Sequence, residues 1–259
     1  MRRSVITMGA LALALGTATA SPGGNAFDIT GGEAIVIRKS GSYTVRRPLK
    51  ARSDQPLVTI AADDVSLDLN GFTLTGLGGK TGAGIVIDGR ANVKVHGGTL
   101  RDFGTALDVR DSSNVVLAGL QISGEDLPGL PPETGILLVN SRGVRMTDNV
   151  IARTFLGVFV RGGGSGANTI KRNTIAGGEN GQLGICYNPA PDADPAVDGP
   201  SGDLVAENHI SRFRTAIQTS PASRANIFVR NYLGFFDLPF DERTPGSNTI
   251  GANLEAALP

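Results

Sequence analysis

The sequence contains few of the residues that usually hold small exported proteins together. Among its 259 residues there are one cysteine, no tryptophan and only 5% aromatic residues. A single cysteine excludes an intramolecular disulfide, so stability has to come from buried apolar surface and backbone pairing. The 24 basic residues are balanced by 24 acidic residues, which argues against nucleic acid or an anionic membrane as a partner.

Long hydrophobic runs are missing as well, with one short exception at the N-terminus. Two arginines precede an apolar run from Val5 to Leu15, and small residues follow as far as Ala20. This pattern predicts a signal peptide over residues 1–20, with cleavage after Ala20 and a secreted or periplasmic location. The run is too short to span a bilayer, so no membrane span is expected once the signal is removed. The arginine pair leaves the export route open between the general and the twin-arginine systems.

What the chain does contain is an internal repeat between Ala83 and Gly124. When the second half is aligned under the first, apolar residues coincide, as Ile85 does with Leu107 at a separation of 22 residues. A fixed period in this range indicates one supersecondary unit stacked on copies of itself. Each unit holds three short segments of alternating apolar and polar residues separated by turn residues, which is the pattern of β-strands. No amphipathic segment of useful length predicts a helix.

The repeat predicts an all-β chain folded as a single-stranded, right-handed parallel β-helix of about seven rungs, with N- and C-terminal caps. Right-handedness follows from the variable spacing of equivalent residues, because left-handed hexapeptide coils keep a constant step. The equivalent positions are Ile85, Leu107, Ile136, Val158, Ile185 and Ile217. The expected boundaries are 21–55 for a leader and N-terminal cap, 56–236 for the helix, and 237–259 for a C-terminal cap or tail. At the usual strand spacing, seven rungs make a rod about 35 Å long.

Two features of the sequence resemble a known family. The segment DDVSLDLNGFTLTG and the turns DNVI, RNTI, ENHI and RNYL are similar to those of right-handed parallel β-helix repeat proteins in the pectin-lyase-like superfamily, over about residues 33–250. That superfamily includes pectate lyases, polygalacturonases, alginate epimerases, phage tailspikes and adhesins. The resemblance implies the fold and suggests a polysaccharide partner, but the fold does not select an activity.

One asparagine precedes the third strand segment in each of the later rungs. These residues are Asn149, Asn173, Asn208 and Asn231. Stacked one above another, their amides are expected to hydrogen-bond along the rod as a structural ladder.

In the enzymes of the superfamily, the cleft lies over the outer face of one sheet, and the first segment of each rung is expected to form that sheet. The candidate catalytic residues on this face are Asp108, Arg110 and Arg161. β-Elimination on a uronate needs a cation to neutralise the sugar carboxylate and a base to take a proton, and this set could supply both. The alternative is that Arg110 and the aligned Asp88 form a solvated ion pair of little energetic value.

The signatures of the characterised enzymes are missing. The calcium-binding acidic cluster of pectate lyases and the Asp-Pro-His motif of alginate epimerases do not occur. The aspartate pair and GHG pattern of polygalacturonases are not found either, because Asp63-Asp64 lies in a turn of the first rung and His96 is part of HGG. We therefore expect no metal site and no cofactor, with Ca²⁺ a requirement only if the chain is a lyase. Asp192, Asp194 and Asp198 alternate like calcium ligands, but the interleaved prolines and the lack of a companion glutamate favour a solvated loop.

The candidate binding residues are Asn188, His209 and Tyr232. The last two are aligned outward neighbours on consecutive rungs and either stack against a sugar or pack on the surface. Cys186 is expected to be inert, because no histidine aligns with its strand.

Two functions remain open: a non-catalytic secreted protein that presents a carbohydrate-binding or surface-interaction face, and a lyase or epimerase of uronate-containing glycans. The sequence does not indicate an oligomeric state.

Overall fold

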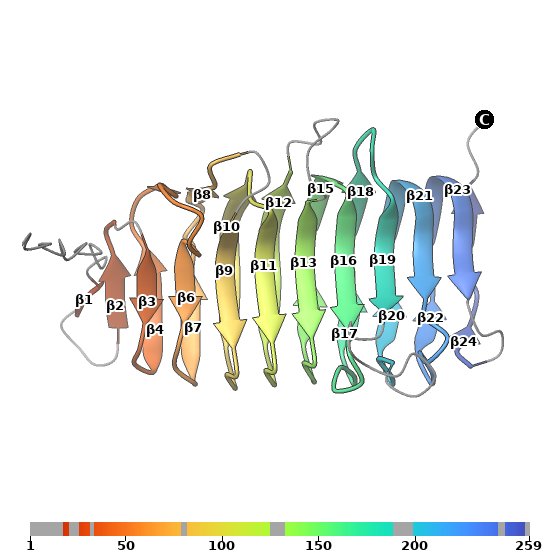
Figure 1. The fold of residues 1–259 in the computed structure, drawn as a ribbon, viewed down its shortest axis with the longest axis horizontal. Coiled ribbons are helices and arrows are strands. Elements are labelled where there is room, and N and C mark those ends of the chain that lie inside the picture. Colours follow the sequence, from red (N-terminus) through yellow and green to blue (C-terminus); the bar gives the residue numbers. More distant parts are fainter. Residues whose placement is uncertain are drawn as a thin grey trace, which may run out of the picture.

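The computed structural model describes residues 18–20, 26–31, 34–78, 82–124, 133–188, 199–242 and 247–256. All of the regular elements in these ranges are β-strands, and they wind into a coil of about eight turns with three parallel sheets along its length (Figure 1). Within the described ranges, no helix is long and apolar enough to cross a bilayer. The predicted parallel β-helix is confirmed.

The first sheet contains the strands that lie side by side across Figure 1. These are β3 (Ile35–Ile37), β6 (Val58–Ile60), β9 (Ala83–Asp88), β11 (Thr105–Arg110), β13 (Thr134–Val139), β16 (Leu156–Arg161), β19 (Leu183–Asn188) and the later parts of β21 (His209–Thr219) and β23 (Tyr232–Glu242).

The second sheet contains β2 (Ala26–Ile29), β4 (Gly41–Val45), β7 (Val65–Asp68), the first parts of β10 (Lys94–Arg101) and β12 (Val116–Ser123), then β14 (Arg145–Thr147), β17 (Thr169–Lys171), β20 (Leu204–Ala206), β22 (Ile227–Val229) and β24 (Thr249–Ile250). The third sheet contains β5 (Leu49–Lys50), β8 (Thr73–Thr75), the later parts of β10 and β12, β15 (Val150–Thr154), β18 (Thr174–Gly177), the first parts of β21 and β23, and β25 (Leu254–Ala256). Strand β1 (Ala18–Ala20) pairs antiparallel with β2.

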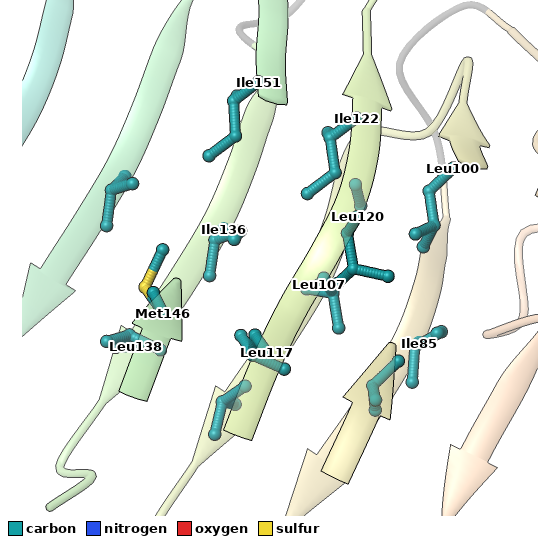
Figure 2. Close-up of a cluster of buried hydrophobic side chains, with 14 of the residues drawn as sticks. Ile85, Leu100, Leu107, Leu117, Leu120, Ile122, Ile136, Leu138, Met146 and Ile151 are labelled. Atoms are coloured by element: carbon teal, nitrogen blue, oxygen red, sulfur yellow. The ribbon is translucent and has the colours of Figure 1, made fainter. Parts of the chain in front are cut away.

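The core consists of aliphatic columns that run along the axis of the coil. On the first sheet, Ile85, Leu107, Ile136 and Val158 are in register on successive strands and have no exposed surface. Figure 2 shows these columns facing residues of the other two sheets, such as Leu117. Side chains alternate between the two faces of a strand, so every second residue points into the coil. Because successive strands are in register, these branched aliphatic residues lie one above another at every turn. This is the burial that the repeat predicts.

From β9 to β21, glycine or alanine lies where each turn enters the first sheet: Gly84, Ala106, Gly135, Gly157, Gly184 and Ala216. Successive turns approach so closely there that a Cβ atom on Gly135 would lie 2.6 Å from the carbonyl oxygen of Gly157. A side chain at Gly135 would therefore require these two turns to move apart.

The coil extends beyond the boundaries expected from the sequence at both ends. β3, β4 and β5 of the expected N-terminal cap already pair in parallel with β6, β7 and β8. Residues 237–242 of the expected C-terminal cap belong to β23, and β24 and β25 add a further turn. These end strands form because the neighbouring turn offers a ready row of backbone hydrogen-bonding groups.

Candidate functional site

The outer face of the first sheet carries one side chain per turn along its central row. From β9 to β23 this row reads Val86, Asp108, Leu137, Phe159, Cys186, Gln218 and Asp241. Apart from Asp108, the row is apolar from Val86 to Phe159, and it ends with Gln218 and Asp241, so the two halves of this face offer different chemistry.

Asp108 and Arg110 bind one another on this face. The Arg110 Nε donates to Asp108 Oδ1 and the Arg110 Nη2 donates to Asp108 Oδ2, each at 2.8 Å. This bidentate hydrogen bond raises the pKa of Arg110. Asp108, two residues away on the same strand, and Asp88, aligned on the preceding turn, both project from the same face as Arg110. Arg110 binds Asp108 instead of Asp88, the partner considered as the alternative from the sequence. Both groups of the proposed catalytic pair are thus occupied by each other.

Arg161 lies apart from this ion pair. Val139 separates it from Arg110 in the register of the sheet, which corresponds to two strand spacings, or about 10 Å. The Arg161 guanidinium carbon lies 5.2 Å from the ring centroid of Phe159, a cation–π contact, and its Nε is buried without a hydrogen-bond partner. The structure therefore does not bring the three candidate catalytic residues into one cluster.

The candidate binding residues are also divided between two faces. Asn188 ends β19 in register with Arg161 and is exposed. His209 and Tyr232 lie on the third sheet, with their ring centroids 4.5 Å apart and their planes tilted by 56°. The ring pair and Asn188 therefore cannot contact one small ligand together.

A groove of about 630 Å³ lies over the polar half of the first sheet, where its strands begin. Its lining residues are Phe155, Gln182, Leu183, Arg214, Thr215, Gln218, Asp237, Leu238 and Asp241. Phe155, Leu183 and Leu238 are its apolar residues; Thr215 lies between the two leucines in the register of the sheet, and the exposed fraction of Leu238 is 41%. The other six lining residues can donate or accept hydrogen bonds.

Two sets of hydrogen bonds hold the groove in shape. Along the central row, Gln218 Nε2 donates to Asp241 Oδ2 at 2.9 Å, and the buried Cys186 thiol donates to Gln218 Oε1 at 3.7 Å. At the corner, the Arg214 and Thr215 backbone N–H groups donate to the turn before β19 at 2.9 Å. The lining side chains thus project from paired backbone rather than from a separate loop.

The sequence analysis missed most of this groove. It placed Asp237, Leu238 and Asp241 in a terminal cap, although the register of β21 with β23 aligns Gln218 with Asp241. The available signal was the alignment of Gln218 with Cys186 on the previous turn, because extending that row by one turn reaches Asp241.

The described residues contain no group of three histidine, cysteine, aspartate or glutamate side chains that could hold a metal ion. Two polar ladders lie inside the coil. In the asparagine ladder, the backbone N–H and the Nδ2 of one residue both donate to Oδ1 of the next, at 2.9–3.0 Å. Its members are Asn149, Asn173, Asn208, Asn231 and Asn253.

A second ladder runs five residues earlier in each turn and was not expected from the sequence. It contains Asn168, Asp203, Asn226 and Asn248, and the Glu242 carboxylate accepts from the last of them. The visible signal was the repeated spacing of ladder residues, as in ANTIKRN and ANIFVRN. Burial raises the pKa of Asp203, and burial together with the charge of Asp203 raises the pKa of Tyr187 well above 10.0.

Residues 24–190 match the family model of the right-handed beta helix region. The chain belongs to this family. Among solved structures, the β-helix is similar to a hyperthermoactive exopolygalacturonase from Thermotoga maritima, at 11% identity and a TM-score of 0.53 over 86% of this chain and 70% of that one. Two further similar structures are a mannuronan C-5 epimerase A-module from Azotobacter vinelandii and an alginate lyase from Paenibacillus sp.

The epimerase module has 10% identity and a TM-score of 0.49, covering 90% of this chain and 89% of that one. The lyase has 12% identity and a TM-score of 0.47, covering 87% of this chain and 91% of that one. At these identities the similarities show the fold alone. No curated protein matches the chain.

Proposed function

We propose that this β-helix is a carbohydrate-binding protein and that the groove over β19, β21 and β23 binds a polysaccharide. The observation that carries the proposal is the lining of the groove, in which phenylalanine and leucine side chains are interspersed with arginine, glutamine, threonine and aspartate side chains. Sugar rings present apolar faces and hydroxyl edges, so a site of this mixed composition matches both surfaces.

The regular spacing of the strands supports a polymer as the ligand. Successive turns lie about 4.8 Å apart and present equivalent positions along the axis. A chain of repeated sugar units can therefore meet similar groups at each step, and the groove already spans three successive first-sheet strands. Because these strands are rigid, little ordering entropy is lost by the protein on binding.

The test is to measure polysaccharide binding by affinity electrophoresis and then, for any glycan that is retained, by isothermal titration calorimetry. We expect Arg214→Ala and Gln218→Ala each to weaken binding about tenfold, the equivalent of one hydrogen bond of about 1.4 kcal/mol. Arg145→Ala is the matched control, since Arg145 is an exposed arginine on the second sheet. Equal losses for Arg214→Ala and Arg145→Ala would contradict binding in the groove.

A second candidate is a polysaccharide lyase or epimerase, and one observation favours it. The groove brings Arg214 and the carboxylates of Asp237 and Asp241 to one site, which is the kind of set that acid–base chemistry on a glycan needs. Catalysis through Asp108, Arg110 and Arg161 has less support, because the first two bind each other and the third lies apart. Incubation with uronans, followed by absorbance of the unsaturated product, tests the lyase directly.

We also propose that the protein is secreted after cleavage of residues 1–20. The support is the sequence pattern, in which two arginines, an apolar run and small residues precede Ser21. N-terminal sequencing of the protein from the culture medium or periplasm is expected to begin at Ser21. A chain that keeps Met1 in the cytoplasm would contradict this proposal.

A further inference from the structure

The charges that line the groove differ from those that a polyuronate would require. Among the described residues of the lining, Arg214 is the one basic residue, whereas Asp237 and Asp241 are both acidic. An anionic sugar placed there would meet two carboxylates for each guanidinium, and removing water from the groove strengthens the repulsion between like charges. The lining therefore disfavours a polymer that carries one carboxylate on each sugar.

The other candidate cations of the first sheet, Arg110 and Arg161, do not line the groove. Arg110 already holds a bidentate bond with Asp108. Arg161 lies two residues along the strand from the level of Gln218 and Asp241, and two and three strand spacings away from them, which corresponds to about 12 and 16 Å.

An unpaired cluster of cations occurs on another face of the coil. A shallow depression of about 470 Å³ on the second sheet is lined by Lys94 and Arg145, together with asparagine and valine side chains and without an acidic residue. This depression and the groove lie on different sheets of the coil. Lys94 and Arg145 are thus separated from the groove, and the net charge of zero provides no general attraction for a polyanion.

From these observations we infer that the groove selects uncharged, hydroxyl-rich pyranose chains over uronate chains. The inference rests on the proposed function and names its ligand class. Aspartate oxygens accept hydrogen bonds from ring hydroxyls, while the Arg214 guanidinium and the Thr215 hydroxyl donate to hydroxyl oxygens. Asp241 also accepts from Gln218, which fixes its carboxylate on the floor of the groove.

The experiment is calorimetric titration of the folded, signal-free protein with two matched series of oligosaccharides. One series contains neutral gluco-, manno- and xylo-oligosaccharides, and the other contains oligogalacturonates and oligomannuronates of equal length. We expect at least one neutral series to bind at least tenfold more tightly than either uronate. The double variant Asp237→Asn, Asp241→Asn should bind uronates more tightly, so the ratio of the uronate Kd to the neutral Kd should fall at least tenfold. Asp88→Asn, which alters an exposed acid of the same sheet outside the groove, should leave the ratio unchanged.

The possible results separate this inference from the proposed function. Tighter binding of uronates, weakened by Arg214→Ala and by added salt, would overturn the selectivity and leave a carbohydrate-binding groove in place. The selectivity would also be overturned if the double variant kept the same ratio of uronate Kd to neutral Kd while circular dichroism showed that it is folded. If the double variant does not fold, the single variant Asp237→Asn provides the same test. Absence of binding to every oligosaccharide and to a broad glycan array would overturn the proposed function and the selectivity with it.

Discussion

Asp203 occupies a ladder position at which the turns on either side have asparagine. Burial raises its pKa above the ordinary value of 3.8, although hydrogen bonds from Asn168 act in the opposite direction. Because the folded state holds the proton more tightly than the unfolded chain does, this residue favours folding most at low pH. Its contribution to stability falls as the pH rises from about 3.8 through the raised pKa of the folded state.

We therefore expect Asp203→Asn to stabilise the protein at neutral pH. The amide can donate to Asn226 and carries no charge to bury, so a gain of about 1 kcal/mol is expected, with a weaker dependence of stability on pH between acid and neutral conditions. Thermal unfolding followed by circular dichroism over a pH series measures both effects. Asp237→Asn alters an exposed aspartate and should change neither the stability at neutral pH nor its dependence on pH. A lower melting temperature for Asp203→Asn at neutral pH would contradict this account.

Asn208 lies inside the first ladder and shows what a continuous ladder contributes. Its Oδ1 accepts from the backbone N–H and the Nδ2 of Asn173, at 2.9 and 3.0 Å. Asn208→Ala leaves the buried Asn173 backbone N–H without its acceptor and removes one acceptor of the Asn173 Nδ2, which also donates to the Met146 and Lys171 carbonyls. We expect a loss of about 2–4 kcal/mol. Urea unfolding measures the loss, and Asn188→Ala, at an exposed asparagine, should change stability by less than about 0.5 kcal/mol. Equal effects of the two substitutions would contradict the importance of the ladder.

At the scale of elements, the corner between the second and third sheets carries charges of alternating sign. Asp148, Arg172, Glu207 and Arg230 succeed one another along the coil, each with a positive φ between 53° and 58°. Arg172 binds Asp148 at 2.8 Å and Arg230 binds Glu207 at 2.9 Å. The hydrogen bond from Arg172 lowers the pKa of Asp148. Each exposed pair is weak alone, but the alternation prevents like charges from stacking at the spacing of the strands.

We expect Arg172→Glu to lower the melting temperature, because it places three acidic residues in succession at this corner. The effect should be largest at low ionic strength and should shrink at high salt, where exposed charges are screened. Thermal unfolding at low and high salt provides the measurement. Arg172→Gln is the matched control and should show a smaller decrease with little salt dependence. A decrease for Arg172→Glu that is independent of salt would indicate a steric cause.

The elements also show which features were predictable from the sequence. Columns such as Ile85 and Leu107 were predictable because burial imposes the same residue type at each turn. The groove was not predictable to the same degree, because Asp237 and Asp241 face outward, where packing imposes no repeated residue type. The pairing of Arg110 with Asp108 depends on the rotamers of two side chains, which a repeat pattern does not contain. The five-residue spacing between the two ladders is visible in the sequence, but Asp203 replaces asparagine at one position of the second ladder, which makes the repeat harder to recognise.

At the scale of the whole molecule, each turn of the coil is stabilised by the turns next to it. Stability in such proteins is roughly a sum of contributions from the turns and from the interfaces between neighbours. The last turn described covers Phe228 and Leu233, which have no exposed surface, and it supplies the final ladder residues Asn248 and Asn253. Its own apolar residues are more open, since the exposed fraction of Leu254 is 65%.

We expect a chain that ends at Glu242 to fold but to be less stable and more prone to associate. It loses β24 and β25, which uncovers the edges of β22 and β23 and leaves the Asn226 and Asn231 amides without their ladder acceptors. Exposed edges of parallel strands are sites at which a second chain can pair. Size-exclusion chromatography with light scattering should show concentration-dependent oligomers, and thermal unfolding should begin at a lower temperature. The matched control is the full-length chain with Leu254→Ser, which keeps the backbone pairing and should remain as monodisperse as the original protein. If the truncated chain matches the full-length protein in both measurements, the last turn does not protect the end of the coil.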